Sequence, residues 1–296
     1  MDKSSSPGTV LITGSSTGIG KVCALYLERA GFRVFAGVRK EADAMALEKE
    51  SSGGLIPVYM DITDGKSVRS AVKVVSASTG GSGIQGLVNN AGISVGGLFE
   101  FLTIGDIRRQ LEVNVIGHSR VTQAFLPMIR QGSGRIVFMG SITGIMPQPF
   151  LSVYSASKAA LEAITDSLRL ELRPWNVPVS IIEPSIIKTP MWDKARDAAY
   201  RTVENFPRRA HELYGPAIRA VLNVLDHPGR IARVATPADK VAKAVEHALT
   251  SERPRYHYIV GWDAKLSYVI AKFAPERMRD WIIMFLWRRL GLKDEV

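Results

Sequence analysis

The chain has 296 residues, of which 46% are hydrophobic, and a formal net charge of +10. Its lysines and arginines are scattered rather than gathered into a basic arm, so the charge does not indicate a nucleic-acid module, and we expect neither a nucleic-acid partner nor a bound metal. A single cysteine, Cys23, excludes an internal disulfide and favours a reducing, cytoplasmic location.

Short apolar runs alternate with longer helical patterns along the chain. The runs are rich in β-branched and aromatic residues and mostly lack strict alternation, which is typical of strands covered on both faces. They span residues 9–13, 33–38, 56–60, 86–90, 135–140, 179–184 and 257–261. Helical patterns lie near residues 19–30, 64–77, 104–130, 153–173 and 237–250. This order predicts an α/β fold with a single doubly wound, Rossmann-type parallel sheet and helices on both faces, in one domain over residues 1–296.

A glycine-rich turn follows the first predicted strand. The segment "TGSSTGIG" holds Gly14, Gly18 and Gly20, and a helix begins near Ile19. Glycines at this place let a pyrophosphate approach the backbone and the helix N-terminus. The alternative is a merely tight turn. Its position at the start of an alternating β/α chain favours nucleotide binding.

The second predicted strand ends in Val38-Arg39, where dinucleotide folds that bind NAD carry an acidic residue. A guanidinium suits the 2′-phosphate of NADP, so we expect NADP, with NAD as the alternative. A solvated surface arginine would also explain Arg39.

Two ionisable side chains stand four residues apart in "YSASK". Tyr154 and Lys158 therefore share one face of a helix. A nearby cation favours a phenolate, so Lys158 is expected to bring the hydroxyl of Tyr154, with an ordinary pKa near ~10, closer to neutral pH. Taken alone, the pair is better explained by a solvated helix face.

Seven short segments in one order resemble the short-chain dehydrogenase/reductase family, and the overall look is most similar to its steroid- and retinol-dehydrogenase-like branch. The segments are "TGSSTGIG", Asp61 in "MDIT", "NNAG" at 89–92, Asn114 in "LEVNVIG", Ser141 in "MGSITG", "YSASK", and "PSIIKT" at 184–189. The resemblance covers about residues 8–261. It implies an NAD(P)-dependent oxidoreductase acting on CH–OH or C=O groups.

The resemblance also implies a role for each matching residue. Tyr154 would be the general acid/base, Ser141 would hydrogen-bond the substrate oxygen, and Asn114 would hold a water that links Lys158 to solvent. The implied cofactor contacts are Gly14, Ser16, Thr17, Gly18, Ile19, Gly20, Arg39, Asp61, Ile62, Asn89, Ala91, Gly92, Tyr154, Lys158, Pro184, Ile187 and Thr189. One departure is Pro184-Ser185, because the family usually has Pro-Gly there, and a serine restricts a backbone that glycine leaves free.

The substrate lid of the family would fall at about residues 190–232, the least regular part of the chain. Its apolar side chains, together with residues 144–151, would line a pocket for a bulky apolar alcohol or ketone such as a steroid or retinoid. They are Met191, Trp192, Tyr200, Phe206, Leu213, Tyr214 and Leu222. Ordinary packing of the lid is the alternative for each of them.

A C-terminal helical extension spans about residues 262–296. Within it, residues 275–292 are apolar on every side of a helix, so this helix is expected to be buried, in its own domain or a partner subunit rather than a lipid interface. The N-terminus has no apolar run of signal-peptide length, and the longest run, Trp281 to Trp287, is too short to span a bilayer. The family resemblance implies a homodimer or homotetramer formed through the helices that contain Asn114 and Tyr154.

Two alternatives to this reading remain. One is a ketoacyl-type reductase of lipid metabolism, whose relatives are typically shorter than this chain. The other is a non-catalytic NADP-binding sensor or scaffold, which would be expected to lose Tyr154, Lys158 or Ser141. All three are present.

Overall fold

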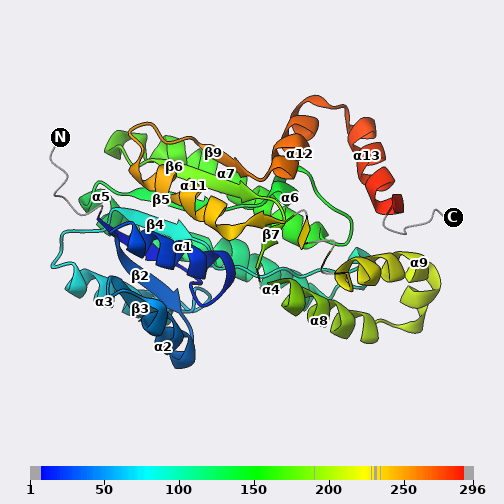
Figure 1. Cartoon of the computed structure of the whole chain (residues 1–296), viewed down its shortest axis with the longest axis horizontal. Coiled ribbons are helices and arrows are strands. Elements are labelled where there is room, and N and C mark those ends of the chain that lie inside the picture. Colours follow the sequence, from blue (N-terminus) through cyan, green and yellow to red (C-terminus); the bar gives the residue numbers. More distant parts are fainter. Residues whose placement is uncertain (1–7, 190, 228, 230–231, 234, 290–296) are drawn as a thin grey trace.

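A seven-stranded parallel sheet forms the centre of the computed structural model, with helices on both faces (Figure 1). The model describes residues 8–189, 191–227, 229, 232–233 and 235–289. The strand order is β3-β2-β1-β4-β5-β6-β9, and every neighbouring pair is parallel. The strands are β1 (Thr9–Ile12), β2 (Arg33–Val38), β3 (Leu55–Tyr59), β4 (Gly86–Asn89), β5 (Arg135–Met139), β6 (Val179–Pro184) and β9 (His257–Val260). The order reverses between β1 and β4, as the doubly wound prediction requires.

Two hydrophobic cores lie between the sheet and the helices that cover its two faces. One core joins the sheet to α1, α2 and α11, and the other joins it to α3, α5 and α7. These helices are α1 (Gly18–Arg29), α2 (Glu41–Glu50), α3 (Gly65–Ser78), α5 (His118–Gln131), α7 (Ser152–Glu171) and α11 (Ala238–Thr250). Strand side chains are buried on both faces, which explains why the sequence runs do not alternate.

The predicted strands are all present, and their ends agree within one residue. The predicted helix over 104–130 is interrupted: α4 (Ile104–Leu111) and α5 are joined by a π-helix, η2 (Glu112–Gly117). Among the described residues, four α-helices were not predicted by the sequence patterns. They are α2, the short α6 (Ile142–Ile145), α8 (Met191–Glu204) and α9 (Arg208–Leu225), the last two in the segment expected to be irregular. Helix α12 (Trp262–Phe273) falls within the expected C-terminal helical extension.

Two short strands outside the main sheet bind the segment after β6 to the chain before α11. They are β7 (Ile187–Lys188) and β8 (Thr236–Pro237), which pair in parallel. The backbone N–H of Thr236 also donates to the carbonyl of Ile186, at 2.8 Å. This small sheet fixes the path of the chain as it leaves β6.

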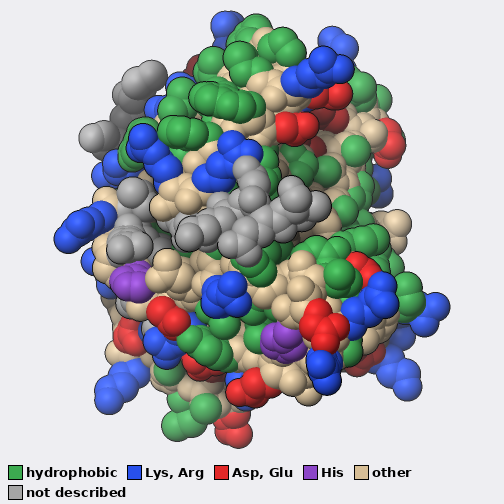
Figure 2. Space-filling model, turned by 90° about the vertical axis from the view of Figure 1, so that its right-hand side faces the viewer, with side chains coloured by type: hydrophobic (Ala, Val, Ile, Leu, Met, Phe, Trp, Pro, Cys, Tyr) green, Lys and Arg blue, Asp and Glu red, His purple; other side chains and the backbone are tan. Residues whose placement is uncertain are grey.

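The C-terminal helices α12 and α13 (Glu276–Arg289) lie apart from the helices that cover the sheet (Figure 1). The sequence predicted the helix but expected it to be buried, and within this chain that expectation is wrong, because α13 has no buried residue among those described. Trp281 is 60% exposed and is stacked on Phe285, and α13 contacts the rest of the chain through Trp287, which meets Phe150 edge-on at 5.3 Å. Figure 2 shows hydrophobic and basic side chains intermingled at the top of the molecule, where these helices lie. Within the described part of the chain, no helix is both long enough and apolar enough to cross a bilayer.

Candidate active site

The candidate residues gather where parallel strands end. The glycine turn follows β1, Arg39 follows β2, Asp61 lies two residues beyond β3, and "NNAG" begins at the last residue of β4. Ser141 lies two residues beyond β5, and Pro184 ends β6. Open α/β sheets bind ligands outside this edge, so the topology alone brings the sequence motifs together.

The glycine turn needs its glycines for both conformation and space. Gly14 and Gly18 have φ values of +67° and +62°, in the left-handed region that favours glycine. A Cβ atom on Gly14 would lie 2.7 Å from the Cα of Ala91, and one on Gly20 would collide with the amide of Asn90 and the carbonyl of Gly14. The turn therefore packs directly on the "NNAG" segment, and its backbone stays open toward the edge of the sheet.

Thr13, which the sequence analysis did not single out, holds the "NNAG" segment in place. Its hydroxyl accepts hydrogen bonds from the backbone N–H groups of Asn90 and Ala91, both at 2.9 Å. Asn89 is fully buried and donates to the hydroxyl of Thr122 at 2.8 Å. Asn89 thus anchors the segment in the core, while the backbone beyond it faces the glycine turn.

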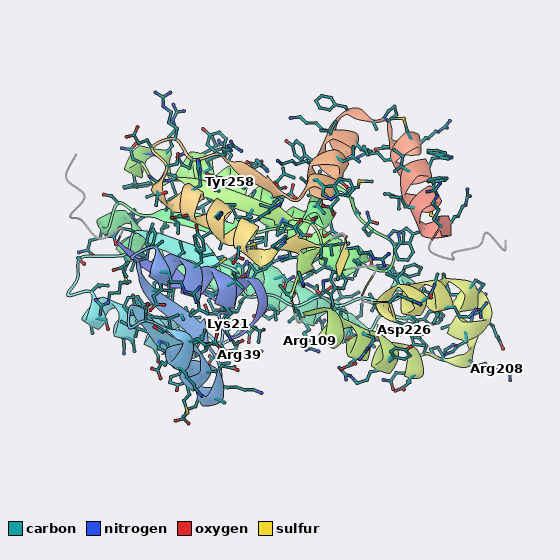
Figure 3. The ribbon with its side chains drawn as sticks, viewed as in Figure 1. Lys21, Arg39, Arg109, Arg208, Asp226 and Tyr258 are labelled. Atoms are coloured by element: carbon teal, nitrogen blue, oxygen red, sulfur yellow. The ribbon has the colours of Figure 1, made fainter. Side chains whose placement is uncertain are left out.

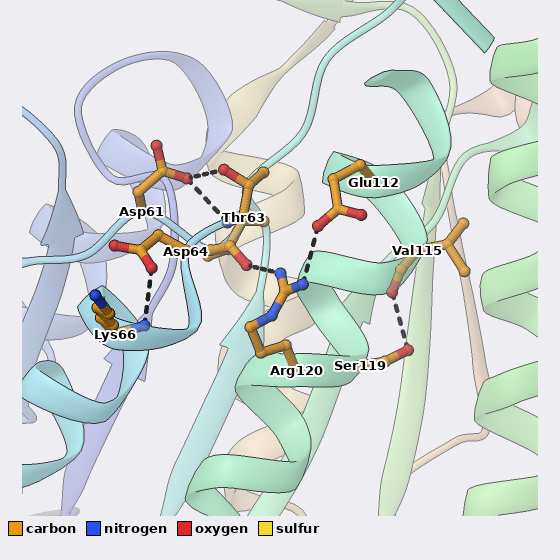
Figure 4. A network of polar contacts seen from close by, with 9 residues as sticks. Asp61, Thr63, Asp64, Lys66, Glu112, Val115, Ser119 and Arg120 are labelled. Carbon is orange, nitrogen blue, oxygen red and sulfur yellow. Dashed lines mark hydrogen bonds and ion pairs between the residues drawn. The ribbon is translucent and has the colours of Figure 1, made fainter. Parts of the chain in front are cut away.

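Arg39 and Asp61 lie at neighbouring strand ends and influence each other. Arg39 is exposed at the end of β2 (Figure 3). Asp61 accepts hydrogen bonds from the backbone and the hydroxyl of Thr63, at 2.9 and 2.6 Å (Figure 4). Burial acts to raise the pKa of Asp61, but these bonds, followed by the charges of Arg39 and Arg120, hold it below its usual value. The carboxyl group is therefore an ionised acceptor next to an exposed guanidinium.

The backbone and the side chain of Ile62 have different surroundings. Its carbonyl accepts from the guanidinium of Arg120 at 2.6 Å, and Arg120 also pairs with Glu112 of η2 (Figure 4). Its side chain belongs to the core and packs against Gly117. The structure thus places the side chain of Ile62 in the interior rather than at the edge where the other candidate residues lie.

Tyr154, Lys158 and Ser141 lie together, with Lys158 and Ser141 buried and Tyr154 half-buried. The amine of Lys158 is 5.6 Å from the centre of the Tyr154 ring, and Ser141 is close enough to the phenol to influence its pKa. Ser141 is the N-cap of α6, and its hydroxyl accepts from the backbone N–H of Thr143 at 3.3 Å. The three side chains come from two segments that are unrelated in sequence, which a solvated helix face would not produce.

The electrostatics of this cluster differ from the expected ones. Burial raises the pKa of Tyr154 above its ordinary value, and the hydrogen bond with Ser141 acts to lower it. Lys158 donates to the carbonyl of Met139 at 2.7 Å, and burial lowers the pKa of its amine to about 8. In this structure the amine is thus held by the end of β5 instead of by the phenol, and the predicted lowering of the tyrosine pKa by Lys158 is not seen.

Asn114 lies in the π-helix, and Gln110, one turn earlier, shares its function. The side chain of Asn114 accepts from the N–H of Ile93 at 2.9 Å and donates to the carbonyl of the same residue at 3.0 Å. Gln110 likewise donates to that carbonyl at 3.0 Å and accepts from the N–H of Val95 at 2.7 Å. Both amides also donate to the hydroxyl of Ser157. The side chains therefore tie the loop after "NNAG" to the helix of Tyr154. Gln110 could have been found as a polar residue spaced four positions from Asn114.

The segment after β6 faces the glycine turn. A Cβ atom on Gly18 would lie 3.9 Å from the side chain of Thr189, so the two segments border the same space. Ile187 is buried, and the hydroxyl of Thr189 has no hydrogen-bond partner among the described residues. Ser185 is not among the residues with positive φ, so its backbone accommodates a side chain where the family usually has glycine.

Apolar side chains from separate segments meet beyond the loop that Asn114 holds. Leu98, Ala210 and Ile218 form the buried centre, and the surrounding residues are Phe101, Phe150, Val203, Phe206, Tyr214 and Leu222. Tyr214 on α9 donates to Glu100 at 2.9 Å, and Trp192 on α8 donates to the carbonyl of Ile187 at 2.9 Å. Tyr200 and Leu213 are exposed and do not belong to this layer, and the side chain of Met191 lies outside the described residues.

His118 is a third residue that sequence reasoning missed, after Thr13 and Gln110. It is fully buried at the start of α5, and its Nε2 contacts the carbonyl of Ala91. Burial, followed by the positive charge of Lys158, lowers its pKa to about 3, so the ring is neutral at physiological pH and Nε2 is the donor. A polar residue four positions after Asn114 was the available signal.

Comparisons with known proteins agree with this arrangement. The family model described as short chain dehydrogenase matches residues 8–199. The chain is 37% identical to 17-beta-hydroxysteroid dehydrogenase type 6 of Bos taurus, over 94% of this chain and 88% of the relative. It is 34% identical to retinol dehydrogenase 5 of Mus musculus, over 97% and 92% of the two chains. A solved short chain dehydrogenase from Burkholderia cenocepacia, in complex with NADP, is 25% identical, has a TM-score of 0.66, and is matched over 96% of this chain and 97% of its own.

Proposed function

The chain belongs to the short chain dehydrogenase family, and from this premise we propose that it is an NADP(H)-dependent oxidoreductase that transfers a hydride between the nicotinamide and a carbonyl or secondary alcohol group of a bulky apolar molecule of the steroid or retinoid kind. The observation that carries the proposal is the cluster of Tyr154, Lys158 and Ser141 beside the glycine turn. The oxidoreductase class rests on the family, whereas the cofactor preference and the substrate are the proposed parts.

The strand ends fit a dinucleotide. A Cβ atom would fill the space at Gly14 and Gly20, and the unpartnered hydroxyl of Thr189 lies across from Gly18. These features suit a pyrophosphate on the glycine turn and a nicotinamide carboxamide at residues 187–189. Arg39, with no acidic residue in its place at the end of β2, supports NADP over NAD.

The substrate class is supported by the apolar layer and by the relatives. Phe150, Phe206 and Tyr214 come from the loop after α6 and from the α8–α9 region, and they lie on the side of the site opposite the strand ends. We propose that α8 and α9 are the substrate lid, and that residues 8–261 form one catalytic core to which the C-terminal helices are added. Two of the relatives are named for a hydroxysteroid and for retinol, and both are apolar polycyclic or polyene alcohols.

The mechanism assigns one task to each residue of the cluster. A bound nicotinamide supplies or accepts the hydride. Ser141 donates a hydrogen bond to the substrate oxygen and orients it toward the phenol. Tyr154 gives its proton to that oxygen in the reduction and takes it back in the oxidation. Lys158 would bind the ribose hydroxyls of the cofactor, and Asn114 keeps the π-helix and the loop at Ile93 in the geometry that a water relay to Lys158 requires.

Two alternative functions are less well supported. A ketoacyl-type reductase shares the same cluster, but α8, α9, α12 and α13 add apolar surface that a short acyl reductase does not need. A non-catalytic sensor would not need Tyr154 to lie beside Ser141 and within 5.6 Å of the amine of Lys158, and this arrangement supports an enzyme.

We also propose a cytoplasmic homo-oligomer that forms through the helices next to Asn114 and Tyr154. Ile104, Ile116 and Leu170 on these helices are 61%, 47% and 59% exposed, which supports a partner surface. Cytoplasmic location is supported by the buried, unpaired Cys23. Peripheral lipid contact by α12 and α13 is the alternative for the C-terminal face. Sedimentation with liposomes tests this lipid contact, by comparison of the full chain with a chain that ends at residue 274.

The function is tested by a panel of steroid, retinoid, aliphatic and aromatic ketones, with the loss of NADPH or NADH absorbance as the signal. We expect turnover of at least one bulky apolar member with NADPH and much slower turnover with NADH. Absence of cofactor oxidation with every member would contradict the enzyme proposal, and equal use of the two cofactors would contradict the role of Arg39.

A further inference from the structure

Helix α7 carries four ionisable side chains at a spacing of four residues, and the mechanism uses only two of them. Tyr154 and Lys158 belong to the active-site cluster, and Glu162 and Asp166 continue the same helix face away from it. Glu162 lies next to Glu183 of β6, and Asp166 is 3.8 Å from the ring of His257 of β9. Acidic groups therefore meet directly behind the catalytic residues, where α7 crosses β6 and β9.

The two glutamates form a carboxyl pair that lacks hydrogen-bond donors. Glu183 is fully buried, and one of its oxygens, Oε2, accepts from Nδ1 of His257 at 3.0 Å. Its other oxygen and Oε1 of Glu162 are both shielded from solvent, and neither has a donor among the described residues. The carboxyl groups of α7 and β6 converge on the ring of His257, whose two nitrogens lie 3.8 Å from Asp166 and 3.0 Å from Glu183. Ionised carboxylates only accept hydrogen bonds, so two buried carboxyl oxygens without donors favour a proton on one of the two glutamates.

The surroundings of the pair favour the proton. Burial, followed by the negative charge of Glu183, raises the pKa of Glu162 to about 8; His257 acts to lower it and Asp166 adds to the rise. These three are the charged groups that face Glu162 from α7, β6 and β9. From α6, the backbone of Gly144 is so close that a Cβ atom there would collide with the carboxyl of Glu162. The site thus has little room for water that could replace the missing donor.

The pair lies at the junction of the catalytic helix with the segment proposed to bind the nicotinamide. Glu183 directly precedes Pro184-Ser185, and the N–H of Ser185 donates to Val260 of β9 at 3.0 Å. One turn earlier on α7, Lys158 is held by the carbonyl of Met139 at the end of β5. Helix α7 is therefore fixed to two adjacent strand ends by two consecutive turns, at Lys158 and at Glu162 (Figure 1).

We propose that Glu162 and Glu183 share one proton at neutral pH, and that this protonated pair is a positioning device that holds residues 184–189 in register with Tyr154 and Lys158. When the proton leaves, two adjacent negative charges repel each other and push β6 away from α7. The catalytic consequence rests on the proposed function, but the shared proton itself does not.

The shared proton is tested by thermal unfolding of the protein without cofactor, between pH 5 and pH 8. The folded pKa of Glu162 lies above its unfolded value, so the pair stabilises most at low pH and this contribution is lost as the pH rises toward about 8. Glu162→Gln keeps a donor at every pH, since its amide donates to Glu183. The matched control is Glu171→Gln, the same change at an exposed position of the same helix.

We expect the Tm of the wild type and of Glu171→Gln to fall more steeply over this range than the Tm of Glu162→Gln. The titration of groups distant from the pair cancels in the comparison, and Lys158, with its pKa of about 8, changes stability only at higher pH. His257 touches the pair and Glu183 raises its pKa, so the three proteins are also compared in a His257→Gln background, where the same difference in slope is expected. Parallel curves for all three proteins would overturn the shared proton. If Glu162→Gln does not fold, Glu183→Gln supplies the donor from the other side and is expected to show the same flattened curve.

The positioning role is tested separately by the affinity for NADPH, measured by quenching of protein fluorescence at pH 7 and pH 9. We expect the wild type to lose about tenfold more affinity than Glu162→Gln over this range, the size of one weakened charge-assisted contact. Equal losses would overturn the positioning role, because the pair would then be structural only. Absence of binding at either pH would contradict the proposed function. The unfolding experiment would still test the shared proton, because it is done without cofactor.

Discussion

The two sides of the site are built differently. On the side of the strand ends, the candidate residues are held by buried hydrogen bonds and close backbone packing, as at Thr13, Asn89 and Asn114. On the side of α8 and α9, they are held mainly by apolar contacts between partly exposed side chains, with few polar ties such as the one between Tyr214 and Glu100.

This difference indicates that the two sides of the site have different roles. Hydrogen-bonded segments at strand ends have one geometry, which suits a cofactor whose shape does not vary. Apolar contacts have no direction, so the helical side can change its lining residues without disturbing the chemistry. Substitutions on the two sides should therefore affect different kinetic constants.

The largest effect is expected on the strand-end side from Tyr154→Phe. Removal of the phenolic proton should lower kcat by about 10²–10⁴-fold, the usual contribution of a general acid/base. Affinity for NADPH should change little, since the ring and Lys158 remain. Tyr59→Phe, at an exposed tyrosine, is the control and should behave as wild type. Activity of Tyr154→Phe near that of the control would remove the phenol from the mechanism.

A smaller effect on the same side is expected from Arg39→Ala. Loss of a charged donor to the 2′-phosphate should raise the KM for NADPH by about 10- to 100-fold and leave the KM for NADH nearly unchanged. Arg29→Ala, at an exposed arginine at the end of α1, controls for the change in net charge. Steady-state kinetics with both cofactors measure the effect, and an equal rise in the two KM values would show that Arg39 does not bind the 2′-phosphate.

The smallest effect is expected on the helical side, from Tyr214→Phe. This change removes the hydrogen bond to Glu100 but keeps the ring packed against Phe101. The KM for the ketone should rise by about two- to tenfold, the range of one neutral-to-charged hydrogen bond at a partly exposed site, with kcat and the KM for NADPH unchanged. Tyr200→Phe, whose hydroxyl bonds to Asp226 on the outer surface, is the control. A fall in kcat would mean that the two sides are not independent.

The sequence predicts the strand-end side well because each motif there has a local cause. Runs such as "RVFAGV" can only be buried strands, and glycines such as Gly14 and Gly20 are needed where segments touch. The helix over Glu41–Glu50 was missed because only Ala44 and Leu47 are buried, so its apolar pattern is weak. Helix α9 was missed because Pro216 lies inside it.

Other features depend on tertiary structure and have no signature in a single sequence. The π-helix at Asn114, the direction of the amine of Lys158, and the pairing of Glu162 with Glu183 all arise from segments distant in the chain. Burial of α13 within its own chain was also expected and is not found, since an all-round apolar pattern shows that a helix needs a partner but not where the partner is.

The pKa of Tyr154, followed by ultraviolet difference spectroscopy of its phenolate against Tyr154→Phe, tests the central claim most directly. Without cofactor, burial should keep this pKa above that of a free phenol. With saturating NADP⁺, the added positive charge next to Lys158 should move the titration to clearly lower pH. An unchanged titration on addition of NADP⁺ would contradict the account, because the tyrosine would then have no reason to exchange protons with a substrate near neutral pH.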